Sequence, residues 1–163
     1  MKSIQFFLLT ILSIALLQSC RYGEGNHTIN QSNLFQLTIP DWVKEEKLGD
    51  DVVCSYANRY RNFYIVVVKA NKDIPFDTFN TRSIHRIHAG LDSSVVSSTF
   101  KENAYFNEVY GKMGKEAEKI YYSQKVINGN KNYYQVAIWT RGLNRKLKYK
   151  PTIDTIMASF KEI

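Results

Sequence analysis

The sequence has only two cysteines, three prolines and eight glycines among its 163 residues. So few cysteines exclude the disulfide-rich secreted scaffolds, and so little proline and glycine excludes collagen-like and low-complexity chains. No apolar run reaches the length of about 20 residues that a membrane-spanning helix needs. The remaining composition, 44% hydrophobic and 23% charged, predicts one compact domain with a packed core.

Apolar residues are concentrated at the N-terminus, where Lys2 precedes an apolar run over residues 6–17. A basic residue followed by a short apolar run is typical of a secretory signal peptide. The run ends in Leu17-Gln18-Ser19-Cys20, which resembles a bacterial lipobox with Cys20 as the residue that receives lipid, including palmitate. We therefore expect a lipoprotein signal peptide over residues 1–19 and a membrane anchor on Cys20. An ordinary signal peptide, with Cys20 incidental, is the alternative.

The residues after Cys20 predict a tether and then a domain. Residues 20–32 are polar and lack hydrophobic periodicity, as expected of a tether, and residues 33–163 then form a single domain. Arg21, rather than Asp, follows Cys20, which favours the outer membrane, facing the periplasm, over retention at the inner membrane.

Lipidation of Cys20 would leave Cys54 without an intrachain disulfide partner. Cys54 lies in an alternating apolar stretch, residues 52–56, where a small buried side chain is expected. A catalytic thiol would need an activating base or a cationic environment, and the sequence indicates neither.

Alternating or continuous apolar stretches predict a sheet of about six strands. The two most apolar stretches, 63–68 and 133–139, are expected to be covered on both faces. Asn128-Gly129 predicts a type I′ hairpin turn, because both residues tolerate a positive φ angle. The predicted strands cover residues 35–39, 51–58, 63–68, 105–110, 119–127 and 133–139.

Two helices are predicted, each opened by a proline. The first runs from Pro75 to Val96 with apolar residues at helical spacing, and the second runs from Pro151 to Phe160. Because consecutive strands connect as hairpins, the domain is expected to be α+β with a mainly antiparallel sheet. Helices are expected on both faces of this sheet, as in an α/β/α sandwich.

Several pieces of the sequence match a known family pattern. They are Phe35-Gln36-Leu37-Thr38-Ile39-Pro40 followed by Trp42, then Tyr64-Ile65-Val66-Val67, Ile127-Asn128-Gly129, Tyr134 with Trp139, and the ending Ser159-Phe160. From Asn33 to Phe160 the chain resembles the PsbP-like superfamily, which includes small bacterial lipoproteins. The resemblance implies an antiparallel sheet between helical layers, used mainly as a protein-binding scaffold without a cofactor. It implies no catalytic or binding residues for this chain.

Catalytic and metal-binding signatures are weak throughout. His85 and His88 are three residues apart, a spacing at which two imidazoles can share a helix face and hold a metal. However, no glutamate lies between them as in His-Glu-x-x-His, and no carboxylate cluster is adjacent. The sequence also has no Gly-x-Ser-x-Gly elbow and no glycine-rich phosphate loop. We therefore expect no enzymatic activity, no metal and no cofactor.

Positive charge is unevenly distributed along the chain. The formal net charge is +7, and between Lys112 and Lys150 ten basic residues face only two acidic ones. Such a patch attracts lipid phosphates, acidic glycans or an acidic protein face, whereas solvation of a sheet edge is the simpler alternative. Export from the cytoplasm argues against a nucleic-acid partner. The basic patch, placed in the link before the last helix, consists of Arg141, Arg145, Lys146, Lys148 and Lys150.

Together these features predict a non-enzymatic, lipid-anchored envelope protein. It would act as a scaffold that binds another envelope protein or an anionic envelope component, with the basic patch as its binding surface. The alternative is a small-ligand carrier whose pocket is lined by aromatic residues, namely Tyr121, Tyr122, Tyr133, Tyr134 and Trp139.

Overall fold

The computed structural model describes residues 25–49, 52–92, 95–114 and 118–163. The predicted signal peptide, residues 1–19, and Cys20 lie outside the described residues. The described part consists of strands and two helices in the order β1 (Asn26–Gln31), β2 (Phe35–Pro40), β3 (Val43–Glu45), β4 (Val52–Asn58), β5 (Phe63–Ala70), α2 (Phe76–His88), β6 (Val95–Lys101), β7 (Ala104–Lys112), β8 (Lys119–Asn128), β9 (Tyr133–Arg141), α3 (Leu143–Ser159) and β10 (Lys161–Glu162).

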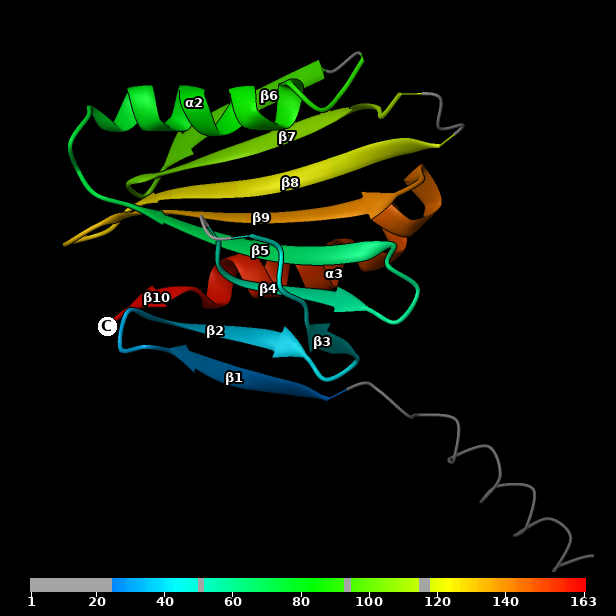
Figure 1. The fold of residues 1–163 in the computed structure, drawn as a ribbon, viewed down its shortest axis with the longest axis horizontal. Coiled ribbons are helices and arrows are strands. Elements are labelled where there is room, and N and C mark those ends of the chain that lie inside the picture. The colour runs from blue at the N-terminus through cyan, green and yellow to red at the C-terminus, as the bar shows by residue number, and fades with distance from the viewer. Residues whose placement is uncertain (1–24, 50–51, 93–94, 115–117) are drawn as a thin grey trace, which may run out of the picture.

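The strands form two sheets, in which all pairs are antiparallel (Figure 1). The larger sheet has seven strands in the order β3-β4-β5-β9-β8-β7-β6, and the smaller sheet has three in the order β1-β2-β10. The predicted α+β class and the mainly antiparallel sheet are confirmed. The predicted number of about six strands is wrong, because short strands and a second sheet escaped the periodicity analysis.

Helix α3 contacts strands of both sheets, namely β8 and β9 of the larger sheet and β2 of the smaller one. Helix α2 contacts β7, β8 and β9 (Figure 1). Neither helix is long and apolar enough to cross a membrane.

The main hydrophobic core lies around α3 and joins the two sheets. Ile153 and Ile156 of α3 pack with side chains of β2, β4, β5 and β9, and burying each large apolar side chain contributes about 1.5–3 kcal/mol. A smaller cluster consists of Phe79 of α2 with Val126 and Tyr133. Residues 133–138 of β9 are all buried, which confirms that this strand is covered on both faces. The largest fully buried side chains of the main core are Tyr134, Phe35, Phe63, Leu37, Ile39, Ile65, Ile138 and Ile156.

Part of the predicted tether is a strand. Residues 26–31 form β1, which pairs with β2 from Asn26 opposite Pro40 to Gln31 opposite Phe35. Most side chains of β1 are exposed, so the strand is polar and shows no hydrophobic alternation. Main-chain hydrogen bonding to β2 keeps it in place, and Ile29 is its one apolar side chain that packs against the main core.

Both predicted helices have different bounds in the structure. The first ends at His88 rather than at Val96, since Val95 begins strand β6. Val95 fits helical spacing, but it also opens a stretch rich in β-branched residues that pairs with β7. The second helix begins at Leu143, so Pro151 lies inside it and not at its start. Pro151 lacks the main-chain N–H that would donate to the preceding turn. The helix nevertheless continues past it, with Ile153, Ile156 and Met157 buried on one side.

The turn predicted at Asn128-Gly129 has another geometry. Strand β8 ends at Asn128 opposite Tyr133, so the loop has four residues, and Gly129 is not in the left-handed region. Gly129 is needed for space instead, because a Cβ there would lie 2.7 Å from Oε2 of Glu162 and 2.8 Å from the main-chain oxygen of Asn132. The two-residue turn with positive φ at both positions joins β6 to β7, at Glu102 and Asn103.

Candidate functional site

The predicted basic patch lies on α3 and not in an irregular link. Arg141 is the last residue of β9, and Gly142, with a φ of 79°, turns the chain into the helix. A positive φ favours glycine at this position. The other four members of the patch, Arg145, Lys146, Lys148 and Lys150, therefore occupy the first turns of α3.

Acidic side chains compensate much of the charge of this basic patch. Nη1 of Arg145 lies 3.0 Å from Oε2 of Glu118. Nζ of Lys150 lies 2.8 Å from Oδ2 of Asp154, and hydrogen bonding to Asp154 raises the pKa of Lys150. The field of the basic patch is consequently weaker than a count of its lysines and arginines suggests.

Two exposed leucines accompany these cations. Leu143 is 51% exposed and Leu147 is 59% exposed, and their spacing of four residues places them on one face of α3. Lys148, also exposed, contacts the ring of Tyr149 through its ammonium group at 5.7 Å from the ring centroid. The start of α3 thus presents apolar and cationic groups together to the surface.

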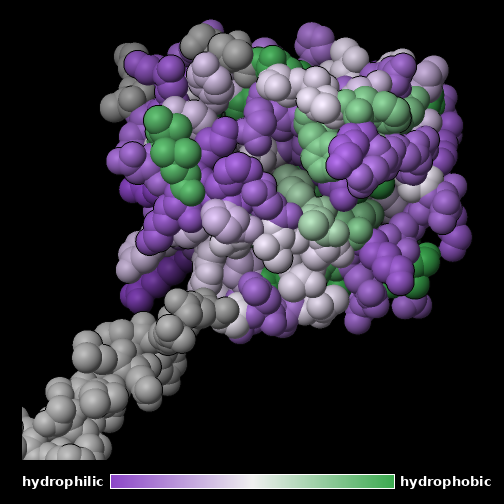
Figure 2. Space-filling model, turned by 180° about the vertical axis from the view of Figure 1, so that it is seen from behind, coloured by the Kyte–Doolittle hydropathy of each residue, from purple (hydrophilic) through white to green (hydrophobic). Residues whose placement is uncertain are grey.

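A groove of about 490 Å³ adjoins this surface, between α3 and the outer strands β6, β7 and β8. Helix α3 lies behind the sheet in Figure 1, and Figure 2 views the molecule from that side, where green apolar side chains gather in a hollow among purple hydrophilic ones. Ile153 and Met157 of α3 form one wall of the groove, and Phe106 of β7 belongs to the opposite side.

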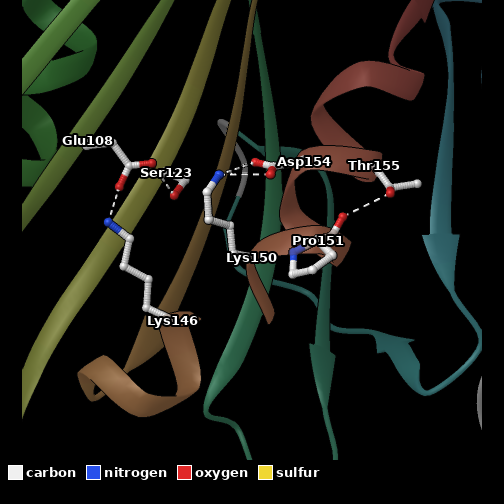
Figure 3. Close-up of polar contacts among 7 residues, drawn as sticks. All are labelled: Glu108, Ser123, Lys146, Lys150, Pro151, Asp154 and Thr155. Carbon is white, nitrogen blue, oxygen red and sulfur yellow. Dashed lines mark hydrogen bonds and ion pairs between the residues drawn. The ribbon is translucent and has the colours of Figure 1, made fainter. Parts of the chain in front are cut away.

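An ion pair joins the helix to the sheet beside the groove. Glu108 on β7 receives a hydrogen bond of 2.7 Å from Oγ of Ser123 on β8 and also accepts one from Nζ of Lys146 (Figure 3). Glu108 and Ser123 are directly opposite each other in the antiparallel register. The sheet therefore orients the carboxylate that holds Lys146.

Lys125 is the half-buried cation of the groove. Its Nζ donates a hydrogen bond of 2.9 Å to the main-chain oxygen of Met157 and lies 5.6 Å from the ring centroid of Phe106. Met157 O belongs to the last turn of α3, where helix carbonyls lack main-chain donors, so the ammonium satisfies one of them. Burial lowers the pKa of Lys125, although Glu102 counteracts part of the effect.

Cys54 is buried, as predicted for a small apolar side chain. It borders a hollow of about 570 Å³ beside the segment that connects β3 to β4. Burial, with a smaller contribution from Glu45, raises the pKa of the thiol to about 12. The thiol is therefore protonated at neutral pH and lacks the thiolate that a nucleophile requires.

His85 and His88 both lie on α2, with ring centroids 6.4 Å apart. Within the described part of the chain, no group of three or more His, Cys, Asp or Glu side chains gathers around them or elsewhere in a way that could hold a metal ion.

The five aromatic residues of the predicted ligand pocket are not brought together. Tyr134 is fully buried in the main core, and the neighbouring Tyr133 belongs to the cluster with Phe79 of α2. The ring of Tyr122 lies tilted against that of Trp139, at 5.5 Å between ring centroids. Tyr121 instead lies against the ring of Tyr110, at 5.5 Å. These residues fill the core or pair across strands, so they do not line one shared pocket.

The groove residues escaped the sequence analysis. Glu108, Lys125 and Lys146 are far apart in the sequence, and only strand pairing and the docking of α3 bring them together. A partial signal was present, because Ser123 and Lys125 are polar residues at alternate positions of β8 and therefore lie on one face of the strand. That pattern indicates a wet strand face but not a groove.

Comparison with known proteins identifies the fold. No protein-family model matches the sequence, and no curated protein sequence matches it. Among solved structures, the Ran-binding protein Mog1p of Saccharomyces cerevisiae is similar with a TM-score of 0.60 and 9% identity, over 85% of this chain and 95% of Mog1p. The cyanobacterial PsbP of Synechocystis sp. PCC 6803, CyanoP, is similar with a TM-score of 0.61 and 12% identity, over 85% of this chain and 92% of CyanoP.

A third similar structure is LpqN of Mycobacterium tuberculosis, described as involved in cell envelope biogenesis. It has a TM-score of 0.54 and 10% identity, over 85% of this chain and 90% of LpqN. Identities this low establish the fold alone. The resemblance expected from the sequence is confirmed at that level, and the domain has the fold of the PsbP/Mog1 superfamily.

Proposed function

We propose that the protein is a non-enzymatic, lipid-anchored envelope protein whose domain is a scaffold for another envelope protein or an anionic envelope component. The binding surface is the start of α3. The observation that carries this proposal is the pairing of exposed Leu143 and Leu147 with the neighbouring cations of the basic patch. Burial of apolar surface is the dominant favourable term in most protein–protein association, and surrounding charges give specificity and speed.

The lipid anchor rests on the sequence. A signal peptide over residues 1–19 would be removed, and Cys20 would carry the acyl chains, placing the domain in the periplasm at the outer membrane. The described domain starts at β1, so a tether of only a few residues, between Cys20 and Asn26, would separate it from the membrane. The fold similarity to LpqN, a protein of cell envelope biogenesis, is in keeping with an envelope location.

The absence of catalysis is supported by the chemistry of the candidate groups. The Cys54 thiol is protonated and buried, and Glu108 is occupied by Ser123 and Lys146. Other proteins of this fold include the Ran-binding Mog1p, which is in keeping with a binding role for the domain.

We also infer that α2 and α3 cover opposite faces of the seven-stranded sheet. Successive side chains of a strand point to opposite faces. Tyr133 packs with Phe79 of α2, whereas the next residue, Tyr134, packs in the cluster that contains Ile153 and Ile156 of α3. In this arrangement β2 shares the layer of α3.

Site-specific photo-crosslinking in cells tests the binding surface. A photoreactive amino acid replaces Leu147 in the full chain, and a second form carries it at Tyr60, which is 77% exposed and lies outside α3. We expect one discrete product from position 147, reduced when Lys148→Glu is added and absent from position 60. The same products from both positions, or none from position 147, would overturn the proposal.

Membrane fractionation tests the anchor separately. Cys20→Ala is expected to release the protein from the membrane fraction, while Cys54→Ala, the matched change at the buried cysteine, leaves it there. Identical fractionation of the Cys20→Ala form and the wild type would contradict the lipoprotein assignment, whatever the crosslinks show.

A further inference from the structure

We propose that the groove between α3 and β6–β8 binds a small amphipathic carboxylate, with Lys125 as the residue that recognises the carboxylate. This site is distinct from the start of α3, where the proposed scaffold surface lies, and it uses a different element, β8, for its charged group. Three observations support it: the charge balance of the groove, the geometry of Lys125 and the apolar wall beside it.

The charge balance leaves one cation unmatched. Three acidic side chains line the groove, and each has a lysine partner of its own: Glu102 pairs with Lys101, Glu108 with Lys146 and Asp154 with Lys150. Among the described residues, Lys125 has no acidic group within ion-pair distance. Lys125 is therefore the lining cation that has no direct ion-pair partner, and Glu102 acts on it only at longer range.

Lys125 also has donors to spare. A lysine ammonium carries three N–H groups, and one is used by the main-chain oxygen of Met157. The contact with the Phe106 ring is electrostatic and needs no directed hydrogen bond. A carboxylate placed in the groove can accept from the remaining N–H groups, and a hydrogen bond between charged groups is stronger than one between neutral groups.

The surroundings select a monoanion with an apolar part. The Phe106 ring lies close to the ammonium, and it provides, with the groove-lining Met157 and Ile153, apolar surface for a short chain or ring. The hydroxyl residues Ser97 and Thr99 border the groove on the side of β6. Because the three carboxylates around the groove repel additional negative charge, a phosphate dianion is a poorer ligand than a monocarboxylate.

The partial burial of Lys125 also favours binding of an anion. Desolvation lowers the pKa of Lys125 and so disfavours its charged form, and a bound anion would offset that cost. Ligand binding should therefore raise the pKa of the Lys125 ammonium, which NMR observation of its Nζ can follow.

The test uses octanoate as the probe and octan-1-ol as its neutral counterpart, titrated into the full chain by calorimetry. Both probes stay monomeric at millimolar concentration. We expect one octanoate per chain, bound at least about tenfold more tightly than octan-1-ol. Lys125→Met should abolish this preference and Lys125→Arg should retain it. Lys44→Met, which removes an exposed charge on β3 outside the groove, should leave it unchanged.

A second variant guards against loss of structure, since Lys125 also holds the end of α3. Ala158 is exposed and borders the groove, so Ala158→Trp fills the space while Lys125 is kept. It should abolish binding of both probes with an unchanged circular dichroism spectrum. Equal affinity for the two probes, an unaltered octanoate preference in Lys125→Met, or no binding at roughly millimolar octanoate would overturn the assignment. None of these results depends on Leu147 crosslinking, so the two proposals can fail separately.

Discussion

Glu108 on β7 and Lys146 on α3 form an ion pair that fastens the start of the helix to the sheet. The Lys146 side chain is 25% exposed and that of Glu108 is 46% exposed, so water screens part of the attraction. A double-mutant cycle of Glu108→Gln with Lys146→Met should give a coupling of about 0.5–1 kcal/mol in urea unfolding. The matched cycle of Glu108→Gln with Lys148→Met should give a coupling near zero. Equal couplings would mean that only the overall charge matters.

Glu162 should make the fold sensitive to acid. Burial raises the pKa of this carboxyl, but hydrogen bonds from the main-chain N–H groups of Asn130 and Lys131 outweigh it, and the net pKa is lowered. A lowered pKa means that the carboxylate stabilises the folded state above the unfolded-state pKa and that this contribution is lost as the pH falls through the folded-state pKa.

The melting temperatures of the wild type and Glu162→Gln, measured from neutral to acidic pH, check this expectation. Their difference should be largest above about pH 5, the range above the unfolded-state pKa, and should shrink as the pH falls through the lowered folded-state pKa. Glu45→Gln, which alters an exposed carboxyl of β3, serves as the control. A difference between wild type and Glu162→Gln that does not change with pH would contradict the role of the charged form.

Gly129 should be intolerant of a side chain. An alanine Cβ would lie 2.8 Å from the main-chain oxygen of Asn132, and a main-chain atom cannot move aside cheaply. Gly129→Ala is expected to destabilise the protein by about 1–3 kcal/mol in urea unfolding. At Gly90 the nearest atom, the main-chain oxygen of Ile87, would be 3.7 Å away, so Gly90→Ala should change stability by less than about 1 kcal/mol. If both variants lose the same stability, crowding at Gly129 is not the cause.

Cys54 should be chemically inert until the protein unfolds. In the Cys20→Ala form it is the lone thiol, and burial raises its pKa to about 12. Reaction with a chromogenic disulfide reagent near pH 8 should be at least roughly 100-fold slower than that of free cysteine. Urea should bring the rate to that of the free thiol. Rapid reaction of the native protein would show that the β3–β4 side opens readily.

The strands that the sequence predicted correctly are those with alternating or continuous apolar residues that become buried. Phe35, Leu37 and Ile39 mark β2 in this way, and their burial is what the alternation reports. Strand β1 could not be predicted from apolar alternation, because its residues are mostly polar and main-chain pairing with β2 holds it in the sheet. The predicted end of the first helix was wrong because Val95 fits helical spacing, but strand pairing with β7 overrides this local signal. The predicted start of the second helix was wrong because proline usually opens a helix, but the packing of α3 against β2 extends the helix on both sides of Pro151.

The candidate site was less accessible to prediction than the fold. The basic residues of α3 could be recognised from the sequence, but their acidic partners Glu108 and Glu118 could not. These partners depend on strand register and on how the helix docks. The sequence did not single out Lys125, because its lack of an ion-pair partner depends on where the fold places all the neighbouring charged side chains.

The small sheet links segments from distant parts of the chain. Its central strand β2 pairs with β1 on one side and, through Gln36 and Phe35, with Lys161 and Glu162 of β10 on the other. During synthesis on the ribosome, β2 emerges long before β10, so one of its edges must wait until residues 161–162 have left the exit tunnel. Until then β2 can be paired along one edge only, so the small sheet cannot be completed before the C-terminal residues are present.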